Sequence, residues 1–456
     1  MLFAEILSRL AAELALFAGV GFLLFALNDL AVDIIYFARS IWRSITIYSR
    51  YPRAFASGLR QPADEGLIAI LVPAWDEAPV IAPMLRATLD RLDYSDYRIF
   101  VGVYQNDPAT AAAVATVADP RLEVVTVPAN GPTTKADCLN YLYDALIEFE
   151  IGSHRSAKAV VLHDAEDVVH PLELRTFNLL IDRAAVVQLP VLPLPDPSSR
   201  WIAGHYCDEF AEAHVKELVV REAIGAAVPL AGVGCAIARR PLAELAALQE
   251  GRPFARASIT EDYEIGLRLG ALGYKTMFVR LPVEPGSRGV VASRGHFPSS
   301  LGDAVRQKAR WLGGIALAGW DRLGWSGGIG ERWMRLRDRR GPMAALLLIA
   351  GYTAALLWSQ IWVAEAIGAP VQVQMDPALV LLLKVNGGLL AWRVLMRACF
   401  TASAYGWGEG LRSVPRLVIG NIIAVLASFR ALSRHLARDN IRWDKTRHIF
   451  PAELPR

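Results

Sequence analysis

The sequence contains little cysteine and has none of the paired spacings that metal or redox sites use. Its 456 residues include four cysteines, Cys138, Cys207, Cys235 and Cys399, which lie far apart along the chain. A CxxC pair is absent, so the spacing excludes a zinc site and a disulfide framework. We therefore expect buried free thiols in a protein whose middle part faces a reducing compartment.

A strong charge imbalance and the common nucleotide-binding loops are also missing. The net charge is only +3, which gives no reason to predict a nucleic-acid partner. No GxxxxGK loop occurs. The stretch "GVGCAI" from Gly232 has Ile237 where a dinucleotide fingerprint has its third glycine, and "GWSGG" from Gly324 follows no predicted strand. These patterns exclude a P-loop and favour neither a Rossmann site nor a nucleophile elbow.

Apolar residues, by contrast, are abundant and unevenly distributed. They make up 54% of the chain, with a mean hydropathy of +0.30, and are densest near the start and in the last quarter. This pattern predicts a soluble domain inserted between membrane segments. We expect four regions: an N-terminal transmembrane helix and a basic interfacial helix in 1–60, the soluble domain in 61–325, two transmembrane helices in 326–400, and an interfacial helix and a C-terminal loop in 401–456.

The arginines predict how these segments are oriented. Several follow the first span, whereas the loop between the second and third spans contains neither lysine nor arginine. The positive-inside rule then places the soluble domain on the cytoplasmic side of the membrane. The last apolar stretch, Leu417 to Phe429, is too short to cross and is basic at both ends, so we expect it to lie in the membrane surface.

The soluble region alternates short apolar runs with helical patterns, which predicts an α/β domain with a largely parallel sheet. The apolar runs are "LIAILVP", "RIFVGVY", "LEVVTVP", "AVVLHD", "AAVVQLPV" and "KTMFV". Ligands of such sheets bind beyond the carboxyl ends of the strands. Polar residues that end these runs should therefore meet in space, namely Asp76 and Glu77, Asn106 and Asp107, and Asp164, Glu166 and Asp167.

Each cluster of polar residues has two interpretations. The carboxylates of "HDAED" either cap the next helix or hold a cation, because three like charges so close together repel one another. Lys135 in "TKADCLN" is either a solvated lysine or a ligand contact. Glu261 and Asp262 in "TEDYE" either cap a helix or do chemistry. The residues Gln307, Arg310 and Trp311 in "QKARW" either belong to a basic membrane-surface helix or bind a ligand.

The order of these motifs resembles glycosyltransferase family 2 membrane synthases, the group of cellulose, chitin and hyaluronan synthases. The stretches "VPAWDE", "TKADCLN", "HDAED", "TEDYE" and "QKARW" follow one another as in that family. The stretches "GHYCDEFAEAHVKELVVREAIG" and "WDKTRHIFP" resemble more narrowly the NfrB type, named for a bacterial phage-adsorption inner-membrane protein. The resemblance implies a GT-A type nucleotide-sugar-binding domain with a mixed, largely parallel sheet, inserted between transmembrane helices.

The resemblance also implies roles for individual residues. Asp262, with Glu261 beside it, is expected to be the catalytic base. Asp164 and either Glu166 or Asp167 are expected to bind Mg²⁺ or Mn²⁺. Trp311, Gly232 and Gly234 are expected at the acceptor. The nucleotide sugar is expected to contact Glu77, Asp107, Lys135, Asp164, Gln307 and Arg310, and a C-terminal loop closing over it would add Trp443, Lys445 and Thr446.

The implied function is transfer of a hexosyl or N-acetylhexosaminyl group from a UDP-linked sugar to a growing exopolysaccharide, with inversion. The alternatives are transfer of a single sugar to a polyprenyl phosphate or other lipid, and a non-catalytic membrane receptor or scaffold that keeps the fold. A homo-oligomer or an envelope export partner fits the small number of spans. Longer members carry a C-terminal cyclic-dinucleotide-binding domain, which we do not expect within these 456 residues.

Overall fold

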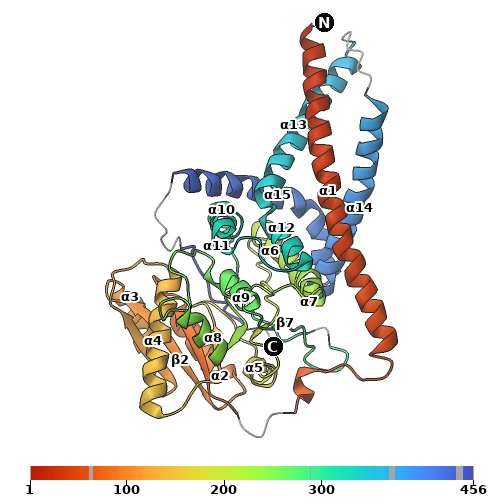
Figure 1. Cartoon of the computed structure of the whole chain (residues 1–456). Helices are drawn as coiled ribbons and strands as arrows, with labels where there is room; N and C mark the ends of the chain where they lie inside the picture. The colour runs from red at the N-terminus through yellow and green to blue at the C-terminus, as the bar shows by residue number, and fades with distance from the viewer. Residues whose placement is uncertain (1, 61–64, 288, 369–374, 438–444, 455–456) are drawn as a thin grey trace.

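A mixed sheet of seven strands forms the centre of the middle domain in the computed structural model, which describes residues 2–60, 65–287, 289–368, 375–437 and 445–454 (Figure 1). The strand order is β3-β2-β1-β4-β6-β5-β7. The strands are β1 (Ile68–Pro73), β2 (Tyr97–Tyr104), β3 (Leu122–Val127), β4 (Ala159–Leu162), β5 (Val186–Gln188), β6 (Cys235–Ala238) and β7 (Thr276–Phe278). Strand β6 runs antiparallel to β4 and β5, whereas the remaining described pairs are parallel. The predicted fold class is confirmed.

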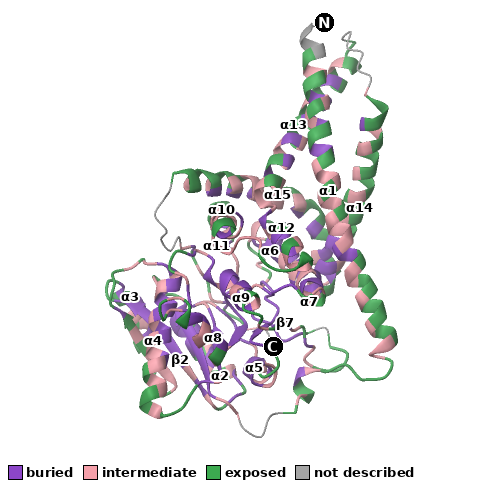
Figure 2. Cartoon of the chain, viewed as in Figure 1, coloured by how far each residue is buried: buried purple, intermediate pink, exposed green. Residues whose placement is uncertain are grey.

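Helices cover both faces of this sheet, which explains why its strands are nearly continuous apolar runs. All of β1 is buried: Ile68 and Ile70 contribute to the core on one face, and Ala69 and Leu71 to the core on the other. The covering helices are α2 (Ile81–Arg91), α3 (Pro108–Ala115), α4 (Lys135–Ser153), α5 (Glu173–Leu180), α8 (Arg239–Ala247) and α9 (Glu261–Ala271). Figure 2 shows that the buried residues gather along the sheet and its covering helices.

The sequence patterns missed one strand, β6. It lies in the stretch that only superficially resembles a dinucleotide fingerprint, and it is four residues long. Three of these residues are fully buried, so β6 shows neither the length nor the alternation by which a strand is recognised. Its antiparallel direction is what makes the sheet mixed.

A layer of shorter helices lies between the sheet and the long helices (Figure 1). These are α6 (Ile202–Glu212), the π-helical η2 (Ala213–Glu217), α7 (Leu218–Ala223), α10 (Leu301–Leu312), the π-helical η3 (Gly313–Ala318), α11 (Gly319–Leu323) and α12 (Ile329–Arg339). A further short turn, η1 (Ala56–Gly58), follows the first helix. This layer places the second half of α10 beside the start of α9, since residues of both line one cavity.

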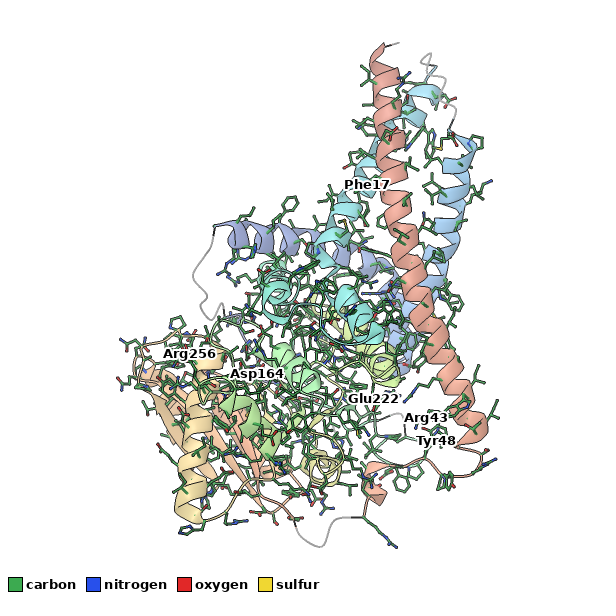
Figure 3. The ribbon with its side chains drawn as sticks, in the orientation of Figure 1. Phe17, Arg43, Tyr48, Asp164, Glu222 and Arg256 are labelled. Carbon is green, nitrogen blue, oxygen red and sulfur yellow. The ribbon has the colours of Figure 1, made fainter. Side chains whose placement is uncertain are left out.

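Within the described residues, four helices are long and apolar enough to cross a membrane: α1 (Leu2–Thr46), α13 (Gly341–Ala366), α14 (Pro377–Tyr405) and α15 (Trp407–Leu436). Helices α1, α13 and α14 run side by side (Figure 1). Phe17 of α1, labelled in Figure 3, is 49% exposed, as a lipid-facing side chain would be. The chain is a membrane protein.

The prediction of a separate interfacial helix after the first span was wrong. Helix α1 continues unbroken for 45 residues. No glycine or proline occurs between Asn28 and Thr46, so nothing in the sequence interrupts the helix. Its last turns extend past the other long helices (Figure 3). In these turns the Arg43 guanidinium lies 5.1 Å from the centroid of the Tyr48 ring.

Helix α15 is longer than the predicted interfacial stretch but has the surface of an interfacial helix. Its 30 residues include the predicted Leu417 to Phe429 and would suffice to cross by length. In Figure 1 it runs across the direction of α1, α13 and α14. Its exposed apolar side chains repeat every three or four residues: Trp407, Leu411, Val414, Val418, Ile422, Leu426, Phe429, Leu432 and Leu436. A helix that packs on protein along one side and exposes an apolar stripe along the other is typical of the membrane surface. The location of α15 in the membrane surface stays a prediction.

Candidate active site

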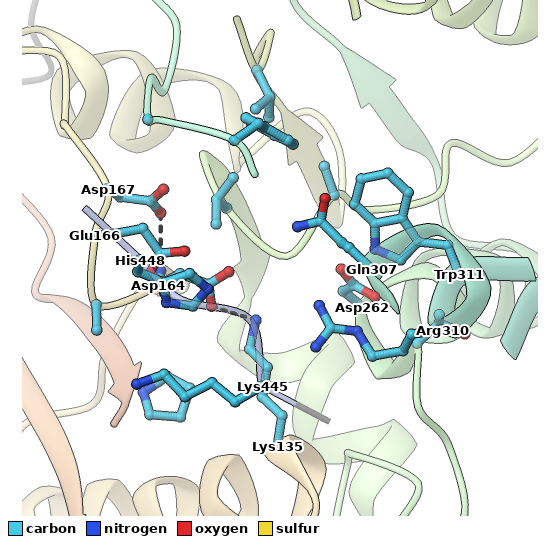
Figure 4. A pocket seen from close by; sticks show the side chains of 18 of the residues that line it. Lys135, Asp164, Glu166, Asp167, Asp262, Gln307, Arg310, Trp311, Lys445 and His448 are labelled. Atoms are coloured by element: carbon cyan, nitrogen blue, oxygen red, sulfur yellow. Dashed lines mark hydrogen bonds and ion pairs between the residues drawn. The ribbon is translucent and has the colours of Figure 1, made fainter. Parts of the chain in front are cut away.

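Most of the predicted site residues line one cavity of about 140 Å³ at the carboxyl ends of β1 and β4 (Figure 4). The predicted residues in its wall are Glu77, Lys135, Asp164, Glu166, Asp167, Glu261, Asp262, Gln307, Arg310, Trp311 and Lys445. In Figure 4 the carboxylates that follow β4 lie on one side of the cavity and the α10 side chains on the other. The structure therefore brings together five motifs that are dispersed along the sequence.

Lys135 and Asp164 form the ion pair at the floor of this cavity. Lys135 Nζ, at the start of α4, lies 2.5 Å from Asp164 Oδ1 and 3.9 Å from Glu261 Oε1. Burial alone raises the pKa of Asp164, but the Lys135 charge outweighs it and holds this pKa below its usual value. Asp164 is thus ionised and already paired with a cation.

The two remaining carboxylates after β4 differ in what they contact. Asp167 Oδ2 accepts a hydrogen bond from the Asp164 backbone N–H at 2.9 Å and lies 3.1 Å from His163 Nδ1, which fixes the loop from inside. Burial raises the pKa of Asp167 to about 7. Glu166 Oε2 is buried and faces the cavity, where it lies 3.1 Å from His448 Nδ1. Of these two, Glu166 is the better placed to bind a cation in the cavity.

Asp262 and Glu261 lie at the first turn of α9, where Asp262 forms part of the cavity wall. Asp262 Oδ1 accepts a hydrogen bond from the Tyr263 backbone N–H at 2.7 Å. Burial raises the pKa of Asp262 above its usual value, and burial together with the Asp262 charge raises that of Glu261 to about 7. A carboxylate whose pKa is raised accepts a proton more readily, which suits a general base.

The residues on α10 close the opposite wall. Gln307 Oε1 is buried and, among the described residues, has no hydrogen-bond partner. The Trp311 ring lies with its centroid 6.2 Å from that of Tyr206 and 6.2 Å from that of Phe210. A buried amide oxygen without a partner indicates that a ligand supplies one.

A second cavity, of about 350 Å³, continues from Asp262 and Trp311 on the side away from the carboxylates. It reaches Val32 on α1 and Arg337 on α12. Asp262 and Trp311 therefore stand between a polar cavity over the sheet and a passage toward the long helices.

Four predicted residues lie outside the wall of the first cavity: Asp107, Gly232, Gly234 and Thr446. Asp107 Oδ1 accepts a hydrogen bond from the Thr110 backbone N–H at 3.2 Å and caps α3, and its Oδ2 accepts one from the Asp76 backbone N–H at 2.6 Å and holds the loop after β1. Gly234 faces Ser293. Trp443 lies outside the described residues, and its predicted contact stays a prediction.

The C-terminal segment contributes a residue to which the sequence motifs gave no role, His448. Its Nδ1 lies 2.8 Å from Glu77 Oε1 and 3.1 Å from Glu166 Oε2. Burial lowers the pKa of His448, but the two carboxylates raise it to about 10. Lys445 Nζ lies 3.2 Å from Glu77 Oε2. We expected this segment to close over a nucleotide; in the structure it already contacts the protein's own carboxylates.

Comparison with known proteins identifies the family. A model described as "Glycosyltransferase like family 2" matches residues 64–314. The chain belongs to glycosyltransferase family 2. Bacteriophage adsorption protein B of Escherichia coli strain K12 and bacteriophage N4 adsorption protein B of E. coli O157:H7 are each 38% identical to this family 2 chain over 457 residues. Each match covers 93% of the chain and 60% of the relative, and it confirms the resemblance to the phage-adsorption type.

A solved structure shows the same fold. The mannosyltransferase from Pyrobaculum calidifontis, in complex with GDP-Man and Mn2+, is 17% identical to this family 2 chain, with a TM-score of 0.53. The match covers 96% of this chain and 100% of that one. At this identity the likeness shows a common fold.

Gly232 gives the first test of this geometry, because it packs directly behind Asp262. A Cβ at Gly232 would lie 2.5 Å from Asp262 Oδ2 and 3.4 Å from Lys135 Nζ. We expect Gly232→Ala to displace the Asp262 carboxylate and to lower kcat about 100-fold, as a misplacement of about 1 Å can do. Steady-state kinetics of nucleoside diphosphate release would measure this.

The matched control for Gly232 is Gly225→Ala. Both glycines have a left-handed backbone, with φ of +78° and +75°, but a Cβ at Gly225 would meet nothing within 4 Å. The two variants therefore carry the same backbone strain, and only one of them touches Asp262. Equal losses of kcat in both would show that strain, and not the contact with Asp262, is responsible.

Proposed function

We propose that this chain is a membrane-embedded inverting glycosyltransferase that transfers a sugar from a UDP-linked donor to a growing exopolysaccharide. The observation that carries the proposal is the position of Asp262. Its carboxylate lies between a cavity with cationic and acidic walls and a second cavity that leads to the long helices. A donor on one side and an acceptor on the other would meet at this base.

The donor cavity suits the diphosphate of a nucleotide sugar together with a divalent cation. Arg310 and Lys445 supply positive charge near the Lys135 and Asp164 pair. Glu166 supplies a buried carboxylate oxygen of the kind that Mg²⁺ and Mn²⁺ prefer. Such an ion, when bound, neutralises the charge that develops on the leaving diphosphate. GDP-Man with Mn2+ in the Pyrobaculum calidifontis enzyme is a precedent for this donor class.

The chemistry assigned to the protein is a single displacement. Asp262 takes the proton from an acceptor hydroxyl as that oxygen attacks the anomeric carbon of the donor sugar. The bond from this carbon to the diphosphate oxygen breaks, and its electron pair leaves with the nucleoside diphosphate. Because the hydroxyl attacks from the face opposite the leaving group, the product has inverted configuration.

The second cavity supports a carbohydrate acceptor over a lipid phosphate. The arginines in its wall are already bound to carboxylates: Arg221 Nη1 lies 2.8 Å from Asp338 Oδ2, and Arg337 Nη1 lies 2.9 Å from Asp29 Oδ1. These paired charges leave little net positive charge for a phosphate, whereas paired ions and an aromatic wall suit a neutral sugar chain. Transfer of one sugar to a lipid phosphate is the second candidate.

The proposed location is the inner membrane of a bacterium, with the sheet domain in the cytoplasm. The arginines at the end of α1, among them Arg39 and Arg43, support this orientation, and so does the loop between α13 and α14, which contains neither lysine nor arginine. Labelling of single introduced cysteines with an impermeant reagent tests it. Labelling of the sheet domain from outside intact cells would overturn this orientation.

The test of function uses the full chain purified in detergent. It is incubated with a panel of UDP- and GDP-linked sugars and Mn²⁺, and both the released nucleoside diphosphate and the size of the product are measured. We expect release with a UDP sugar and a product of many sugar units. A product with a single lipid-linked sugar would replace the polymer with the second candidate, and no transfer from any donor would favour a non-catalytic receptor.

A further inference from the structure

We propose that two copies of this chain pair in parallel along one exposed face of α1. This face consists of positions that alternate by three and four residues from one end of the helix to the other. We call it the seam; its positions are Ile6, Leu10, Glu13, Phe17, Val20, Leu24, Leu27, Ala31, Ile34, Ala38, Ile41 and Ile45. Every position is exposed except Ala31, which is half-buried, and every one except Glu13 is apolar. Alternation by three and four residues is the spacing by which two helices wind around each other as a coiled coil.

The opposite face of α1 is already covered by the chain itself. Ala11 packs with Trp358 of α13, and Val32 packs with Val220 of α7. Helices α14 and η2 also contact α1. Exposed residues repeat along the rest of the helix (Figure 2). The seam is therefore the face of α1 that the described part of the chain leaves uncovered.

The last third of the seam lies beyond the apolar part of the span. Asp29 Oδ1 lies 2.9 Å from Arg337 Nη1 of α12. Ion pairs of this kind belong at or below the membrane surface, since charges are costly in hydrocarbon. Ile45 lies roughly 24 Å farther along the helix axis, at 1.5 Å per residue. Between them, Arg39 lies 3.9 Å from Glu222 of α7, so this part of α1 runs beside the catalytic domain.

The apolar side chains on this last part of the seam are widely exposed. Ile34, Ile41 and Ile45 are 59%, 60% and 68% exposed, and Trp42 beside them is 58% exposed. Within the bilayer such exposure is ordinary because lipid covers it, but a continuous apolar row in water marks an interaction surface. A partner that covers this row would gain the hydrophobic driving force that helix pairs lack inside lipid.

The partner must be a helix that crosses the membrane and continues below it in the same direction as α1. Only such a helix can follow the seam from Ile6 to Ile45 in one register. Helix α1 has 45 residues, whereas α13, α14 and α15 have 26, 29 and 30. Among the helices that the structure describes, α1 alone has the required length, and a second α1 necessarily carries the same repeat. Two copies inserted in the membrane in one orientation form a parallel pair.

Glu13 supports a protein partner along the upper part of the seam as well. It is the one ionisable residue of the seam, it is exposed, and it lies within the first candidate span. A carboxylate that faces lipid is costly, and such residues almost always face protein or a water-filled cavity. Arg9 precedes Glu13 by one helical turn, so a parallel pair brings two cations and two carboxylates to the same level of the interface.

The test introduces single cysteines on α1 and oxidises isolated membranes with copper phenanthroline. We expect Ala38→Cys and Ile41→Cys to give disulfide-linked dimers of twice the chain mass, because equal seam positions of two copies face each other. The matched control is Ser40→Cys, which lies between them, is also exposed and is turned away from the seam. Its dimer yield should be at least about tenfold lower. The wild-type chain, with its four free cysteines, gives the background.

A second pair of variants tests whether packing along the seam holds the two copies together. Ile41→Lys, added to Ala38→Cys, removes an apolar contact and places two like charges in the interface. It should lower the dimer yield at least about tenfold. Ser40→Lys in the same background should leave the yield unchanged. Both side chains are exposed in the single chain, so neither change should affect its folding.

Several results would overturn the inference. Equal yields for Ser40→Cys and Ala38→Cys would indicate random collision, and no dimer from either seam cysteine would show that two copies do not meet there. A cross-linked product of another mass would assign the seam to a different protein. A yield that Ile41→Lys leaves unchanged would exclude packing along the seam. Sugar transfer enters none of these measurements, so they leave the proposed function untouched.

Discussion

Asp262→Asn should lower turnover about 10²- to 10⁴-fold while nucleotide affinity changes little. The amide has the size of the carboxylate and can still accept the hydrogen bond from the Tyr263 backbone N–H, which is 2.7 Å long. What it loses is the ability to take a proton from the acceptor hydroxyl. The measurement is nucleoside diphosphate release for kcat, with calorimetric titration of UDP and Mn²⁺ for binding.

The matched control for Asp262 is Asp182→Asn, which makes the same chemical change at a surface carboxylate that pairs with Lys158 and is 65% exposed. We expect wild-type kcat for it. A kcat for Asp262→Asn within a fewfold of wild type would remove Asp262 as the base. Glu261, whose pKa is raised to about 7 and which lies 3.9 Å from Lys135, would then be the next residue to test.

The strands with long apolar runs could be predicted from the sequence because both faces of the sheet are buried. Such burial leaves a run like "LIAILVP" without polar interruptions, and the residues that end it mark the edge where ligands bind. Strand β6 was missed because four residues are too few to show a pattern. The unbroken course of α1 past the first span was missed because the change from apolar to basic composition does not itself end a helix.

The roles of individual carboxylates were harder to predict than the location of the site that they surround. Asp107 ends β2 as a ligand contact would, yet its two oxygens accept backbone hydrogen bonds from Asp76 and Thr110. Asp167 follows Glu166 directly, yet it points back to His163. Which way a side chain turns depends on neighbours that the local sequence does not contain. His448 shows the same limit, since its partner Glu77 lies 371 residues away.

Arg416→Met should destabilise the folded protein by about 3–5 kcal/mol, the cost of breaking a buried ion pair on one side. Arg416 on α15 is fully buried; its Nη1 donates hydrogen bonds to the Gly204 carbonyl oxygen at 2.6 Å and to Asp208 Oδ1 at 3.1 Å. Asp208 on α6 is fully buried too, and its other cationic partner, Arg397, lies 3.7 Å away. Removing the guanidinium leaves the Asp208 carboxylate buried beside a single, more distant charge.

Thermal unfolding of the purified protein in detergent would measure this, and the chain offers two controls. Arg412→Met, one turn earlier on α15, removes an arginine that is 44% exposed and pairs with Glu409, so it should change the unfolding temperature little. Adding Asp208→Asn to Arg416→Met removes the unpaired Asp208 charge and should restore part of the lost stability.

Helix α15 also supports the acceptor side of the site, since Ile423 packs with Tyr206 and Ala304 in the cluster that Trp311 joins. Arg416→Met should therefore raise the KM for acceptor more than that for donor. If it unfolds at the same temperature as Arg412→Met, the buried pair does not hold α15 on the catalytic domain.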